Sequence, residues 1–112
     1  MHSLPLTRVF TLLEPGPVVL VCTSNGGRDN VMTISWTMVL DFAARFALTT
    51  GPWSPSFAAL RETGECVLAF PTVALIDTVV GMGTCSGVDT DKFARFGLTR
   101  VPAAQVRAPL LA

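Results

Sequence analysis

The chain has 112 residues, of which 50% are hydrophobic and only 14% charged, and its formal net charge is zero. This length suits a single domain over residues 1–112. The balanced charge without a basic cluster argues against nucleic acid as a partner, and no uncharged run reaches the roughly 20 residues of a membrane span. Since an average soluble domain is about 25% charged, apolar surface should remain uncovered here, which predicts a homodimer.

The first half of the chain predicts strands. The segment PVVLVCT (17–23) is rich in β-branched residues, and SNGGRD (24–29) carries turn residues. The segment NVMTISWTMVL (30–40) then reads as a second, buried strand, so that the three together predict a β-hairpin. A third strand is predicted at ARFALTT (44–50), which Gly51 and Pro52 end.

The next segment predicts a helix followed by a strand. Ser54 can cap a helix, Pro55 suits its first turn, and Gly64 can close it after SFAALRET. ECVLAFP (65–71) then reads as a strand that Pro71 stops.

Two further helices are predicted towards the end of the chain. TVALIDTVVG (72–81) could be a short helix with Val73, Ile76 and Val80 facing inward, and DTDKFARFG (89–97) has helix-capping residues and ends at Gly97. Because a hairpin opens the chain, antiparallel β structure with inserted helices fits better than a parallel doubly wound sheet.

The predicted strand 30–40 carries three hydroxyl side chains at alternate positions: Thr33, Ser35 and Thr37. Side chains alternate between the faces of a strand, so these hydroxyls should line one face. One interpretation is an ordinary half-wet sheet face, because Thr favours strands. The other is a polar ligand along this face, held by hydroxyl and backbone donors.

Lys92 is the best-placed cation in the sequence. It falls in the first turn of the predicted helix 89–97, after a loop of small residues at 81–87. Free N–H groups and the helix dipole at such a start favour an anion, and Lys92 would add a charge. The alternative is a solvated surface lysine. Together with the hydroxyls and Trp36, this pattern favours a nucleotide-like site.

Other chemistry has little support in the sequence. The three cysteines, Cys22, Cys66 and Cys85, form no CxxC pair, and His2 is the only histidine. We therefore predict no metal site and no catalytic side chain, and we read the cysteines as free thiols in the reducing cytoplasm. The first residues do not combine a basic segment with a long apolar core, so we expect no secretory signal.

The order and spacing of three segments resemble the flavin reductase-like family of FMN-binding split-barrel proteins, of the flavoredoxin type. They are PGPVVLVCTS…GRDNVMTISWTMVL, SFAALRETGECVLAFP and CSGVDTDKFARFGLT, and the resemblance runs from about Pro15 to Pro109. It implies a mainly β fold, an antiparallel Greek-key split β-barrel with short helices, and a homodimer that holds FMN near the subunit interface.

The resemblance also implies a set of cofactor-binding residues. Matched by position, they are the strand residues Asn30, Thr33, Ser35, Trp36 and Thr37, the helix-start residue Ser56 as a phosphate contact, and Lys92 of the DKF motif. In a regular strand Trp36 faces away from the hydroxyls. Either a bulge re-aims Trp36, or the flavin crosses the end of the strand and uses backbone groups, or Trp36 serves the other subunit's site.

The function implied is that of an oxidoreductase or electron-transfer protein. Bound FMN would take hydride from NADH or NADPH and pass electrons to free flavin or another acceptor. Members of the family are longer, so the barrel is expected to be incomplete at the C-terminus, as in a fragment, a truncated product or one half of a split protein. The alternative function is a non-catalytic binding or scaffold module that has lost the cofactor.

Overall fold

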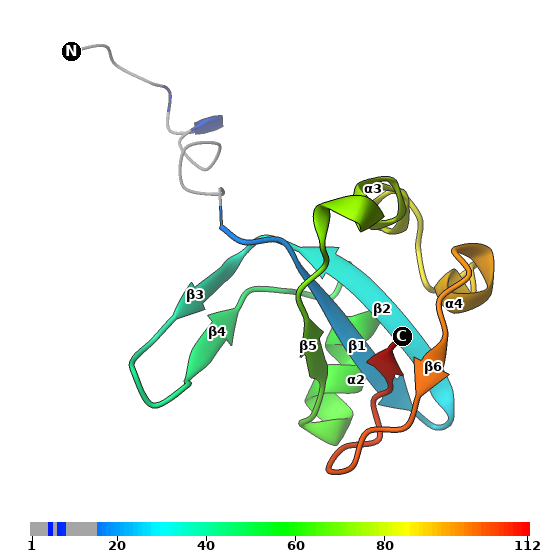
Figure 1. The fold of residues 1–112 in the computed structure, drawn as a ribbon. Coiled ribbons are helices and arrows are strands. Elements are labelled where there is room, and N and C mark those ends of the chain that lie inside the picture. Colours follow the sequence, from blue (N-terminus) through cyan, green and yellow to red (C-terminus); the bar gives the residue numbers. More distant parts are fainter. Residues whose placement is uncertain (1–4, 6, 9–15) are drawn as a thin grey trace.

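The computed structural model describes residues 5, 7–8 and 16–112, so that His2 and Pro15 lie outside the described residues. Its centre is a three-stranded antiparallel sheet with the strand order β2-β1-β5. The strands are β1 (Val19–Asn25), β2 (Arg28–Ile34) and β5 (Val67–Ala69). Since β1 lies between the other two, its residues Val19–Ser24 are all buried (Figure 1).

The predicted hairpin is confirmed in β1 and β2. Asn25 pairs with Arg28, which leaves Gly26 and Gly27 as a two-residue turn, and both have positive φ values of 57° and 79°. Two such residues form a type I′ turn, whose twist matches that of the flanking strands. The turn needs only these glycines, so each strand extends further towards it than the sequence predicted.

The prediction of one continuous strand over residues 30–40 is wrong. β2 ends at Ile34, and β3 (Thr37–Val39) pairs instead with β4 (Phe46–Leu48) in a separate two-stranded ribbon. At the break, the N–H of Thr37 donates to the carbonyl of Ser35 over 2.9 Å. The regular alternation of side chains therefore stops at Ser35, and Thr33 and Thr37 belong to different sheets.

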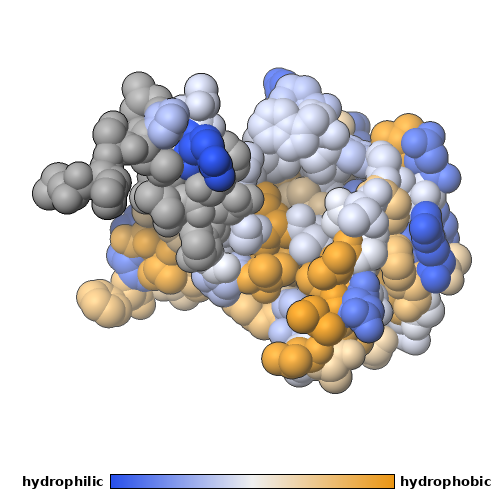
Figure 2. Space-filling model, turned by 90° about the horizontal axis from the view of Figure 1, so that it is seen from above, coloured by the Kyte–Doolittle hydropathy of each residue, from blue (hydrophilic) through white to orange (hydrophobic). Residues whose placement is uncertain are grey.

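The β3–β4 ribbon extends away from the central sheet (Figure 1). Five of its apolar side chains are more than half exposed: Met38, Val39, Leu40, Phe42 and Phe46. Figure 2, which views the molecule from above, shows orange hydrophobic residues in several places along the lower part of the view, with blue hydrophilic residues among them. Apolar surface is thus left uncovered in the single chain, as its low charge content predicts.

Helix α2 (Pro55–Thr63) begins and ends where the sequence predicted, with Ser54 as its N-cap residue and Gly64, at φ 67°, as its C-cap. The Ser54 hydroxyl does not cap the helix but donates to the sulfur of Met32 over 3.4 Å. The helix covers one face of the sheet. The buried residues there are Val19, Val21 and Met32, with partly buried Leu48, Leu60 and Leu68 around them.

The other face of the sheet is covered by α3 (Ile76–Gly83), which follows a 3₁₀ turn, η1 (Val73–Leu75), and by α4 (Lys92–Arg95). The core on this face contains Leu20, Cys22, Val31, Val79, Met82 and Phe93. The prediction that Val73, Ile76 and Val80 face inward is wrong, because they are 85%, 59% and 60% exposed. Residues 72–81 are apolar on several sides, so their pattern alone does not fix the buried face.

Two short strands at the end of the chain, β6 (Arg100–Val101) and β7 (Leu110–Leu111), pair with each other and were not predicted. The expected antiparallel β fold with short helices is confirmed. The closed split barrel is not shown, because the strands of the described residues form three separate sheets. No helix within this part of the chain is long and apolar enough to cross a membrane.

Candidate functional site

A pocket of about 430 Å³ runs along the outer edge of β2. Asn30 and Met32 line it from one face of the strand, and Thr33 lines it from the other. Both faces contribute because the pocket follows the edge: within the described residues β2 pairs with β1 on one side and with no strand on the other. An edge strand presents unpaired backbone N–H and C=O groups, so the pocket offers main-chain hydrogen bonds along its length.

The start of α2 forms one wall of the pocket through Trp53, Ser54 and Pro55. Ser56, the predicted phosphate contact, lies one residue further on and is fully buried. Its Oγ accepts hydrogen bonds from Asn30 Nδ2 over 2.8 Å and from Thr23 Oγ1 over 3.3 Å. Ser56 therefore ties the helix start to the sheet and is not among the residues that line the pocket.

The opposite wall is the loop from Gly83 to Gly87 together with Lys92. This loop lies directly against β2, because a Cβ atom on Gly87 would overlap the Oδ1 atom of Asn30. Only glycine allows the backbone to approach the strand so closely. Asn30 thus contacts both walls, the loop through Oδ1 and α2 through Nδ2.

Lys92 is only 6% exposed, and its Nζ donates to the carbonyl of Met82 over 2.7 Å. None of the ion pairs found among the described residues includes Lys92. Burial lowers the pKa of Lys92, and the nearby Cys85 opposes this shift. A lysine has three N–H donors, so two remain for a ligand, and a buried cation without an acidic partner favours an anion.

The helix start at Lys92 does not offer the free N–H groups that we expected. The Oδ1 atom of Asp91 accepts the N–H groups of Phe93 over 3.0 Å and of Ala94 over 3.2 Å. α4 also has only four residues. The attraction for an anion at this wall therefore comes from the lysine side chain and not from the helix.

The predicted row of hydroxyls is used mainly by the fold. Thr33 Oγ1 donates to the carbonyl of Val79 over 3.0 Å, and Thr37 Oγ1 contacts the carbonyl of Pro17 at 3.5 Å. Of the seven predicted residues, the pocket brings together Asn30, Thr33, Trp36 and Lys92, whereas Ser35, Thr37 and Ser56 do not line it. Trp36 joins Thr33 in the pocket because the strand breaks between them.

The sequence did not point to several other lining residues: Met32, Thr49, Thr50, Trp53 and Ser54. One signal was available, because Trp53 and Ser54 directly precede the helix start that was singled out for Ser56. The loop of small residues predicted at 81–87 was part of the nucleotide-like pattern, and its residues 82–87 line the pocket.

The lining residues suit a flat, largely uncharged ring system that carries an anionic tail. The pocket volume falls within the roughly 300–1,000 Å³ of small-molecule sites. Two indoles and two methionines supply apolar surface, hydroxyl and main-chain groups supply hydrogen bonds, and Lys92 supplies a charge. The part of the chain that the structure describes contains no group of three side chains able to hold a metal ion.

Comparison with known proteins gives an independent view of this arrangement. A family model described as Flavin reductase like domain matches residues 12–112. An uncharacterised protein of Archaeoglobus fulgidus is 32% identical over 83 residues, which are 73% of this chain and 47% of that protein. The chain thus spans about half the length of the curated relatives it matches.

Solved structures share the fold. Flavoredoxin of Desulfovibrio vulgaris (Miyazaki F) matches with a TM-score of 0.81 and 26% identity over 100% of this chain and 58% of its own. The FMN-binding domain of a flavin reductases-like enzyme from Shewanella baltica matches with a TM-score of 0.80 and 28% identity over 99% of this chain and 59% of its own.

Proposed function

The chain belongs to the Flavin reductase like domain family, and on this premise we propose that it binds FMN in the pocket along β2 and acts as an oxidoreductase or electron-transfer protein. NADH or NADPH is the proposed electron donor, and free flavin or another acceptor takes the electrons. The three sheets of the structure then correspond to part of a split barrel.

The observation that carries this proposal is the meeting of Asn30, Thr33, Trp36 and Lys92 in one pocket. These residues come from two distant parts of the sequence, and the resemblance of the sequence to the family implies a flavin contact for each of them. The pocket also supplies what FMN requires chemically: an open strand edge and indole rings for the isoalloxazine, and a buried ammonium group for the phosphate.

The protein's own residues bind and orient in this proposal. Lys92 holds the phosphate, main-chain groups of β2 hydrogen-bond the polar edge of the ring, and Trp36 with Trp53 shields the ring from water. FMN itself supplies the redox chemistry, which agrees with a pocket that contains no acid–base pair among its lining residues. Ser35, Thr37 and Ser56 do not contact FMN in this proposal. They shape the pocket indirectly, through the strand break and the start of α2.

We propose further that two copies of the chain form a homodimer through the exposed apolar side chains of the β3–β4 ribbon, and that the protein works in the cytoplasm. Val39 and Phe46, a cross-strand pair at 66% and 55% exposure, lie on one face of the ribbon, and Met38 at 61% exposure lies on the other. Covering such a ribbon removes apolar area from water, and the charges in its turn, Asp41 and Arg45, are already paired with each other.

The direct test is reconstitution. The purified protein is mixed with FMN and desalted, and its absorbance in the flavin bands is measured before and after anaerobic addition of NADH or NADPH. Retained absorbance that either nucleotide bleaches supports the whole proposal. Retained absorbance without bleaching restricts it to FMN binding, and a colourless protein at saturating FMN would favour the non-catalytic module.

A further inference from the structure

We propose that Arg28 is a positioning residue for this pocket, acting from outside it. The inference rests on the proposed function and extends it to a side chain that does not touch the ligand. Arg28 lines a second hollow of about 280 Å³ on the far side of the loop 83–91, and it is absent from the lining of the FMN pocket. Its guanidinium group holds that loop against β2 in the position that forms the pocket wall.

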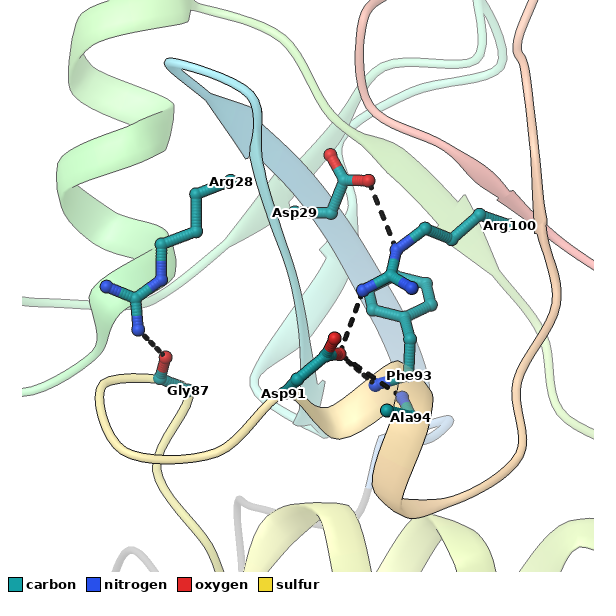
Figure 3. A network of polar contacts seen from close by, with 7 residues as sticks. All are labelled: Arg28, Asp29, Gly87, Asp91, Phe93, Ala94 and Arg100. Atoms are coloured by element: carbon teal, nitrogen blue, oxygen red, sulfur yellow. Dashed lines mark hydrogen bonds and ion pairs between the residues drawn. The ribbon is translucent and has the colours of Figure 1, made fainter.

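The contacts of Arg28 are unusual for an exposed arginine. Its Nη2 atom donates to the carbonyl of Gly87 over 2.6 Å (Figure 3). The same atom donates to the carbonyl of Val88 over 2.6 Å. Within the described residues, none of the ion pairs includes Arg28. The side chain thus directs its donors to two consecutive carbonyls of a loop 59 and 60 residues away in sequence.

Arg28 holds the middle of the loop, whereas other contacts hold its C-terminal end. Arg100 Nε lies 3.3 Å from Asp29, its Nη2 lies 2.8 Å from Asp91, and its guanidinium lies 4.1 Å from the centre of the Phe93 ring (Figure 3). These contacts fix the residues on either side of Lys92. In the middle of the loop, the bond from Arg28 joins the loop to β2 at the point where Gly87 lies against Asn30.

Both ends of the loop meet at Lys92. The chain enters the loop after Met82, whose carbonyl accepts from Lys92, and leaves it at Asp91, which precedes Lys92. If the middle of the loop moves away from β2, the wall that surrounds the ammonium group moves with it. Arg28 therefore controls how well Lys92 meets an anion, although Arg28 itself makes no contact in the pocket.

The test is a double-mutant cycle on the full chain, with Arg28→Ala, Lys92→Met and the double variant, and with Arg61→Ala as the control. Arg61 is an exposed arginine on α2 that stacks on Phe57 at 5.8 Å and lies outside the pocket. FMN affinity is measured by titration at a temperature where thermal melts show every variant folded. Hydrogen exchange of the backbone amides in residues 84–90 is measured without ligand.

We expect Arg28→Ala to weaken FMN about tenfold when Lys92 is present, and to have little further effect when Lys92 is Met. We also expect faster exchange of the loop amides, and no change in either quantity for Arg61→Ala. An equal loss in both backgrounds would overturn the proposal, because Arg28 would then act independently of Lys92. Unchanged loop exchange would overturn it too. If the wild-type chain binds no FMN, the proposed function fails, and the exchange measurement still decides whether Arg28 holds the loop.

Discussion

Replacing Lys92 with Met removes every donor of the one buried cation that lines the pocket, while it keeps an apolar chain of similar length. In the wild-type protein one N–H of Lys92 is used by the carbonyl of Met82 and two are left for a ligand. A hydrogen bond to a charged group contributes about 1.5–3 kcal/mol, so losing one contact to phosphate should weaken FMN by about 10- to 150-fold.

The stability of the ligand-free protein should respond quite differently. Removing a buried ammonium group without an acidic partner relieves a desolvation cost, whereas the Met82 carbonyl loses its partner, which costs about 1–3 kcal/mol. The two effects oppose each other, so we expect the free energy of unfolding to change by less than about 2 kcal/mol. Urea denaturation followed by circular dichroism measures this change.

The ligand and the solution conditions sharpen the test. Riboflavin lacks the phosphate, so its affinity should change little in Lys92→Met. Since burial already lowers the pKa of Lys92, the wild-type protein should lose FMN affinity as the pH rises through that lowered pKa, and the Met variant should not. Salt should reduce the effect only in part, because buried charges are poorly screened. Unchanged FMN affinity combined with a destabilised apoprotein would refute the assignment.

Three other predictions concern different parts of the molecule. Thr33→Val should lower the free energy of unfolding by about 0.5–1.5 kcal/mol in urea, because the bond to the Val79 carbonyl is lost; no loss would show that this hydroxyl is not structural. Cys85 should react with a thiol reagent before Cys22, whose pKa burial raises to about 12, and bound FMN should slow the reaction; equal rates with and without FMN would contradict the assigned pocket. Met38→Lys should convert the dimer into a monomer by light scattering, and a monomeric wild type would contradict the proposed interface.

Local signals allowed the hairpin and the first helix to be predicted from the sequence. Gly26 and Gly27 are the residues that a two-residue turn requires, and Ser54, Pro55 and Gly64 mark the ends of α2. In each case the decisive physical preference belongs to residues a few positions apart. Such signals do not depend on the rest of the fold.

The features that could not be predicted depend on distant contacts. Residues 30–40 alternate without interruption in sequence, yet the strand breaks at Ser35, because Thr37–Val39 pair with Phe46–Leu48. Likewise, Lys92 carried no sign of being buried, since the carbonyl that accepts its hydrogen bond belongs to Met82 on another helix. The residue types of the site were therefore predictable, but their division between ligand and fold was not.

The open edge of β2 has a consequence for how the protein behaves at high concentration. Unpaired backbone groups on an edge strand are also the groups to which another chain can add as a strand, and this is a common route to aggregation. The start of α2 and the loop before Gly87 flank this edge on either side, and the pocket between them leaves it accessible. A molecule bound in that pocket would cover the edge, so the supply of ligand would bear on the solubility of the protein as well as on its chemistry.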